Sequence, residues 1–133
     1  MAEKLKILIA EDEEVTRHLF QIAFRDGEQF EARLVSNGEE ALIAFKEWHP
    51  DIILLDIMMP QMNGFETLQV IRQTLNDKTT SVIMVSSVSD KQDIVACAKL
   101  GIQGYILKPF EVKTLAATVV GYHQKHKKVT KVI

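Results

Sequence analysis

Acidic side chains directly follow two apolar stretches of this sequence. Asp56 follows the aliphatic run 52–55, and Glu11 and Asp12 follow the apolar run 6–10. Short, continuous apolar runs of this kind predict strands that are buried on both faces of a parallel sheet. An aspartate at the carboxyl end of such a strand can serve a ligand site, or it can simply begin a turn.

Two other polar side chains take the same kind of position. Ser86 follows the apolar run 81–85, and Lys108 follows the run 104–107. In a parallel sheet the carboxyl ends of the strands lie on one edge, so we expect these two residues to meet the three acids there. Three crowded carboxylates repel one another and raise each other's pKa unless a cation lies between them.

The chemistry that suits this set of residues is phosphoryl transfer. Mg²⁺ typically uses one or two carboxylates together with water and phosphate oxygens. Lys108 supplies a positive charge for a phosphate, and the Ser86 hydroxyl can donate a hydrogen bond to it. Because carboxylates are established nucleophiles that form aspartyl phosphates, the pattern predicts Asp56 as the phosphoryl acceptor.

The elements that must position these residues alternate between strand and helix patterns. This alternation predicts an α/β fold: a doubly wound, flavodoxin-like parallel sheet of five strands in the order 2-1-3-4-5, with five helices. Strands are expected over residues 6–10, 30–35, 52–55, 81–85 and 104–107, and helices over a segment ending at 26–27 and over 39–48, 65–75, 90–100 and about 111–126.

The first helix is expected to place one apolar stripe toward the sheet. Val15, Leu19 and Ile22 recur at helical spacing and predict that stripe, with Phe20 and Phe24 beside it. Glu13 and Glu14, which directly precede Val15, need no function beyond the favourable interaction of negative charge with the start of a helix.

Length and composition set further bounds. The 133 residues suit one domain, expected over 1–126, and 127–133 is interpreted as a basic tail or the start of a linker. A net charge of −2 gives no whole-chain attraction to nucleic acid or to an anionic membrane. Cys97 is the single cysteine, so a reducing, cytoplasmic setting is expected, and its apolar neighbours indicate simple packing. No apolar run approaches the roughly 20 residues of a membrane span.

Taken together, these motifs resemble the receiver domain of two-component response regulators, close to the single-domain chemotaxis type. The resemblance runs from Leu5 to about Tyr122. Asp56 lies 44 residues after Asp12, 30 before Ser86 and 52 before Lys108. The motifs that carry the resemblance are the pair 11–12, Asp56, the segment 59–64, Ser86, and Tyr105 with the segment 108–110.

The resemblance implies a metal-assisted phosphoacceptor. Asp56 is expected to take a phosphoryl group from a histidine kinase, a histidine phosphotransfer protein or a small acyl phosphate. Asp12 and Asp56 are expected to bind Mg²⁺ together with the backbone carbonyl of Met58, while Glu11 acts through water. Here Glu11 replaces the aspartate that is commoner in the family.

Three further roles follow from the same resemblance. Lys108 is expected to pair with Asp56 and then with the phosphate, and its bond to Pro109 is expected to be cis. Ser86, which replaces the commoner threonine, is expected to bond to the phosphoryl group. Tyr105 takes the switch position and is expected to turn inward behind Ser86.

The output is expected to be a signal rather than catalysis on another molecule. The surface of the fourth helix, fifth strand and last helix is expected to bind a target protein or a second copy of the chain, with no direct contact to nucleic acid or membrane. The basic residues Lys125, Lys127, Lys128 and Lys131 are interpreted as charges that suit a helix C-terminus.

Two alternatives compete with this interpretation. A haloacid-dehalogenase-type phosphatase needs a second acid two residues after the nucleophile, but that position is Met58. A pseudo-receiver that binds partners without phosphorylation is disfavoured by the intact acids, Ser86 and Lys108. Because Met58 and Val88 are apolar and flank the path of an attacking water, we also expect a long-lived phosphoryl group.

Overall fold

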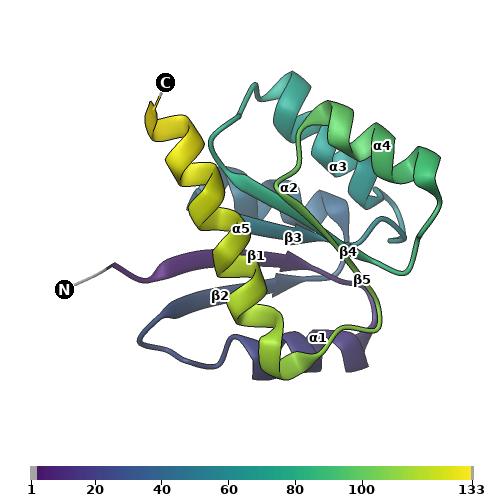
Figure 1. The fold of residues 1–133 in the computed structure, drawn as a ribbon. Coiled ribbons are helices and arrows are strands. Elements are labelled where there is room, and N and C mark those ends of the chain that lie inside the picture. Colours follow the sequence, from purple (N-terminus) through teal and green to yellow (C-terminus); the bar gives the residue numbers. More distant parts are fainter. Residues whose placement is uncertain (1–2, 133) are drawn as a thin grey trace.

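The computed structural model describes residues 3–132 as a parallel five-stranded sheet between two layers of helices (Figure 1). The strand order is β2-β1-β3-β4-β5, and every neighbouring pair is parallel. The fold class and strand order predicted from the sequence are therefore confirmed. The strands are β1 (Leu5–Ala10), β2 (Phe30–Val35), β3 (Ile52–Leu55), β4 (Ser81–Ser86) and β5 (Gly104–Leu107).

Five α-helices connect and cover these strands in the described part of the chain. They are α1 (Glu14–Ala23), α2 (Gly38–Trp48), α3 (Gly64–Gln69), α4 (Lys91–Leu100) and α5 (Val112–Val132). A π-helical turn, η1 (Val70–Thr74), directly extends α3. Within residues 3–132, none of the helices combines the length and the apolar character that crossing a bilayer requires.

Alternate side chains of the central strands feed two separate cores. Leu8 and Ile53 pack with α2, α3 and α4 on one face, where Cys97 is buried as its apolar neighbours suggested. Ile7 and Ile52 pack with α1 and α5 on the other face (Figure 1). All four residues of β3 are buried, as expected for a central strand covered on both sides.

The inward face of α1 differs from the prediction. Phe20 and Phe24 are buried, whereas Val15 is 75% exposed and Ile22 is 38% exposed. Phe20 stacks against Phe110 with ring centroids 4.9 Å apart, and Phe24 lies against another aromatic ring. The two phenylalanines bury more apolar area than the aliphatic residues could, so they decide which stripe of α1 faces the sheet.

The third helix also departs from the expected continuous segment over 65–75. Its last turn widens into η1, in which the Leu75 amide donates to the Val70 carbonyl at 2.8 Å. Arg72 lies in this turn and is buried, being 7% exposed. Its guanidinium donates to Gly101 O and Asp77 O at 2.9 Å each, and also to Thr80 O and Gln103 Oε1.

The last helix continues beyond the end expected near His126. It runs to Val132, because no glycine or proline between 127 and 132 ends it. The backbone of 127–132 is therefore helical and not an irregular tail. The domain boundary placed at residue 126 stays a prediction.

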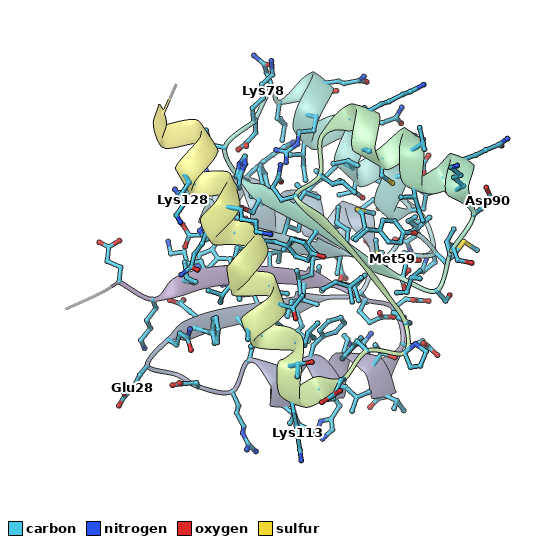
Figure 2. The ribbon with its side chains drawn as sticks, viewed as in Figure 1. Glu28, Met59, Lys78, Asp90, Lys113 and Lys128 are labelled. Carbon is cyan, nitrogen blue, oxygen red and sulfur yellow. The ribbon has the colours of Figure 1, made fainter. Side chains whose placement is uncertain are left out.

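We expect Arg72→Met to lower the free energy of unfolding by about 3 kcal/mol, because it leaves buried acceptors unpaired. Urea unfolding followed by circular dichroism measures this change. Lys78→Met is the matched control, since Lys78 is exposed and points into solvent (Figure 2), and it should change stability by less than about 0.5 kcal/mol. Equal stabilities for the two variants would contradict a structural role for the Arg72 network.

Candidate functional site

One ammonium group bridges two buried carboxylates at the carboxyl edge of the sheet. Lys108, which follows β5, places Nζ 2.5 Å from Glu11 Oε1 and 2.6 Å from Asp56 Oδ2. Glu11 directly follows β1 and Asp56 directly follows β3. Both acids are buried, with 0% and 5% of their surfaces exposed. The strands thus bring together residues that lie up to 97 positions apart in the chain.

Burial and hydrogen bonding shift the pKa values of Glu11 and Lys108 in opposite directions. Burial raises the pKa of the Glu11 carboxyl, although the hydrogen bond from Lys108 opposes this rise. Burial alone would lower the pKa of Lys108, but its hydrogen bonds to Asp56 and Glu11 outweigh burial and raise that pKa. Lys108 therefore stays protonated at neutral pH and offsets the charge of the two buried carboxylates.

A third carboxylate completes an oxygen-rich cluster. Glu11, Asp12 and Asp56 each offer a carboxylate oxygen, and these atoms lie within 4.8 Å of one another. Two of the carboxylates are oriented by backbone amides: Glu13 N donates to Glu11 Oε2 at 3.1 Å, and Met58 N donates to Asp56 Oδ1 at 3.2 Å. All three residues offer oxygen ligands, and Asp12 is exposed to solvent. This combination suits a hard cation that keeps part of its water shell, so the residues fit Mg²⁺.

The cluster opens into a pocket of about 600 Å³. Asp12, Glu13, Asp56 and Lys108 form its charged part, while Leu19 and Phe110 contribute to an apolar part. The remaining lining residues are Thr16, Met58, Ser87 and Pro109. A small molecule can therefore reach Asp56 from solvent along a partly apolar wall.

The loop after Asp56 is held close to that residue. Gly64 N donates to Ile57 O at 3.0 Å, and a Cβ atom at Gly64 would collide with the Asp56 carbonyl oxygen. Asn63 caps α3 in a reciprocal capping box with Glu66. The glycine and the cap together fix the chain that follows Asp56.

Ser86 and Tyr105 converge on one loop residue. Ser86 is fully buried at the end of β4, and its Oγ accepts a hydrogen bond from Val88 N at 3.3 Å. Tyr105 is half-buried in β5, and its hydroxyl donates to Val88 O at 2.6 Å. The Ser86 carbonyl also accepts from Lys108 N at 3.0 Å. The side chains of both residues thus hold the β4–α4 loop through Val88.

Other positions expected from the resemblance have mixed outcomes. The Lys108–Pro109 peptide is cis, as predicted. The Met58 side chain is exposed, and its backbone amide bonds to Asp56, while the metal-ligand role of its carbonyl stays a prediction. Sequence reasoning missed Arg17, whose guanidinium bonds the Glu11 and Asp12 carbonyls. Its place in the first turns of the helix, five residues after Asp12, was the available signal.

Comparison with known proteins decides the family. The family model described as "Response regulator receiver domain" matches residues 7–120. The chain belongs to the response regulator receiver domain family. The resemblance inferred from the motifs is therefore confirmed.

Named relatives of this receiver domain are longer regulators. It is 35% identical over 114 residues to the DNA-binding response regulator MtrA of Mycobacterium tuberculosis, covering 86% of this chain and 48% of that protein. It is 30% identical over 128 residues to the probable transcriptional regulator ycf27 of Porphyra purpurea, covering 96% of this chain and 51% of that protein. The chain thus spans about half the length of the curated relatives it matches.

Solved structures match the receiver domain over nearly its whole length. Chemotaxis protein CheY4 of Vibrio cholerae superposes with a TM-score of 0.82 at 26% identity, covering 90% of this chain and 99% of that one. The signal receiver domain of a putative Luxo repressor protein from Vibrio parahaemolyticus gives a TM-score of 0.85 at 25% identity, covering 98% of both chains.

The raised pKa of Glu11 predicts how Mg²⁺ stabilises the receiver domain as pH changes. The pKa of Glu11 in the folded protein lies above its ordinary value of 4.5, so the folded protein binds this proton more tightly than the unfolded chain does. Without Mg²⁺, the free energy of unfolding therefore falls as pH rises through the raised pKa. Because Mg²⁺ competes with that proton, its stabilising effect should be larger at about pH 8 than at about pH 5.

Thermal unfolding with and without Mg²⁺ measures this difference. A Mg²⁺ concentration about a hundredfold above Kd should add about 2.7 kcal/mol. Glu11→Gln removes the titrating group and is the control, in which the Mg²⁺ effect should depend less on pH. An identical pH dependence in wild type and Glu11→Gln would contradict the assignment.

Proposed function

We propose that this receiver domain is the phosphoacceptor of a two-component phosphorelay. Asp56 takes a phosphoryl group from the phosphohistidine of a histidine kinase or of a histidine phosphotransfer protein, and its phosphorylation switches a protein-interaction surface. The observation that carries the proposal is the Lys108 ammonium, which bridges Glu11 and Asp56 at the base of an open pocket.

The transfer step needs positioning and no general base. An Asp56 carboxylate oxygen attacks phosphorus, the bond from phosphorus to the donor's imidazole nitrogen breaks, and its electron pair stays on that nitrogen. Met58 N and Lys108 Nζ hold the two carboxylate oxygens of Asp56 in place. Lys108 can then shift its hydrogen bond from the carboxylate to a phosphoryl oxygen.

Mg²⁺ completes the neutralisation of charge. Held by Asp12, Asp56 and the Met58 carbonyl, with Glu11 acting through water, the bound ion would stabilise the negative charge of the phosphoryl oxygens. Lys108 pairs with two of these acids, Glu11 and Asp56. Its ammonium would therefore share the neutralisation of their charge with the bound ion.

The output uses the loop that Ser86 and Tyr105 share. When the Ser86 hydroxyl turns to donate to the phosphoryl group, its bond with Val88 N is lost and the loop can move. The Tyr105 hydroxyl, bonded to Val88 O, couples that movement to β5. Exposed Val95 on α4 and Leu107 on β5 give this side an apolar character that suits a target protein or a second copy of the chain.

The named DNA-binding and transcriptional relatives do not change this proposal, because the match covers only about half of their length. The absence of direct contact with nucleic acid, the cytoplasmic setting and a signalling role without catalysis on other molecules stay predictions. The alternative is a pseudo-receiver that works without phosphorylation. Measuring whether the protein takes up a phosphoryl group distinguishes the two.

Incubation with Mg²⁺ and acetyl phosphate, or with a phosphorylated histidine kinase, should add one labile phosphoryl group to the wild type, as measured by intact-protein mass spectrometry. Asp56→Asn should lose this mass gain completely. Asp51→Asn is the matched control, because Asp51 precedes the same strand at the opposite edge of the sheet, and it should gain mass as the wild type does.

Each contrary result has a definite meaning. An unmodified wild type would favour a pseudo-receiver, and an unchanged gain in Asp56→Asn would place the acceptor elsewhere. Steady release of phosphate in many turnovers would indicate a phosphatase.

The phosphoryl group should be long-lived, because apolar side chains flank the acceptor. Met58 is 65% exposed beside Asp56, and Val88 is half-buried, so neither side chain can orient an attacking water. We expect Met58→Asn and Val88→Glu to shorten the lifetime of the phosphoryl group after the donor is removed, and Met58→Leu to leave it unchanged. Loss of the mass gain with time gives the rate, and acceleration by neither polar variant would refute this role.

A further inference from the structure

Arg17 clamps the backbone of the two acids that open the site. One guanidinium nitrogen, Nη1, donates to the carbonyl oxygens of Glu11 and Asp12 at 2.9 Å each. The side chain comes from the first turns of α1 and reaches back to the loop that precedes this helix. Charged donors make the stronger kind of hydrogen bond, so this contact ties the loop to the helix.

The clamp matters more for Asp12 than for Glu11. The Glu11 carboxylate is buried and is already held by Lys108 and by Glu13 N. Asp12 is exposed, so packing does not fix the direction of its carboxylate. The two carbonyls belong to the successive peptides on either side of the Asp12 Cα, so holding both of them fixes the backbone at Asp12 and the direction in which its side chain leaves the chain.

The charge of Arg17 also acts on a carboxylate at the start of α2. Glu40 on α2 accepts hydrogen bonds from Ser36 N at 2.8 Å and from Ser36 Oγ at 2.9 Å. These bonds lower the pKa of the Glu40 carboxyl, and the positive charge of Arg17 contributes to the same shift. Arg17 thus contacts the β1–α1 loop directly and acts on the start of α2 through its charge.

We infer that Arg17 is a positioning residue for the Mg²⁺-binding acids, an inference that rests on the proposed function. The charge of Arg17 and its hydrogen bonds to the loop should have opposite effects on the affinity for Mg²⁺. As a nearby positive charge, Arg17 repels a cation, so removing it would strengthen Mg²⁺ binding. As a clamp on the Asp12 backbone, it supports the metal site, so removing it weakens binding.

Calorimetric titration with Mg²⁺ separates the two effects. Arg17→Met should raise the Kd for Mg²⁺ about tenfold, in the range found when groups that orient metal ligands are removed. Arg17→Lys keeps the charge and a donor for the carbonyls and should recover part of the affinity. Arg25→Met is the control, since Arg25 is exposed just beyond α1, and its Kd should match that of the wild type.

A kinetic measurement tests whether Arg17→Met acts through the binding of Mg²⁺. With acetyl phosphate as donor, the Mg²⁺ concentration for half-maximal phosphorylation of Arg17→Met should rise by the same factor, while the rate at saturating Mg²⁺ stays near the wild-type rate. Circular dichroism in metal-free buffer confirms that the variants are folded. If Arg17→Met is unfolded, Arg17→Gln takes its place with the same expected loss.

The possible failures are distinguishable. An unchanged or lower Kd in the neutral variant, or no recovery in Arg17→Lys, overturns the positioning role. A wild type that binds no Mg²⁺ overturns the proposed function itself.

Discussion

The contact between Lys108 and the two buried acids is the constraint on which the site depends. A carboxylate without a partner is costly to bury, and two side by side are costlier still. The ammonium at 2.5 Å from Glu11 and 2.6 Å from Asp56 offsets that cost. The contact that permits the burial of Asp56 therefore also fixes the position of its carboxylate.

This contact is possible only because the sheet is parallel. Glu11, Asp56 and Lys108 follow three different strands, and a parallel arrangement delivers every strand end to the same edge. The two apolar cores lie behind that edge and hold the strands in register. Buried aliphatic side chains of the central strands therefore fix the geometry of the site, although they do not line its pocket.

The same distinction explains what could be predicted from the sequence. The strands and the acids at their ends follow from local patterns, because a buried strand and the residue after it are adjacent in the chain. Strand order follows from the regular alternation of strands and helices. The inward stripe of α1 could not be predicted, since it depends on Phe20 meeting Phe110, 90 residues away. The π-helical turn at Arg72 and the reach of Arg17 likewise depend on acceptors that only the folded chain brings near.

Hydrogen bonds hold Asp56 more firmly than they hold the β4–α4 loop. Asp56 is held by the flanking loop, by Met58 N and by Lys108, so it has little freedom. The β4–α4 loop has no ladder partner, and side chains from β4 and β5 hold it through Val88. Exchanging one of those bonds for a bond to a phosphoryl oxygen costs far less than moving a strand. Under the proposed function, a change of charge at Asp56 would therefore be transmitted through the part of the edge that is easiest to rearrange.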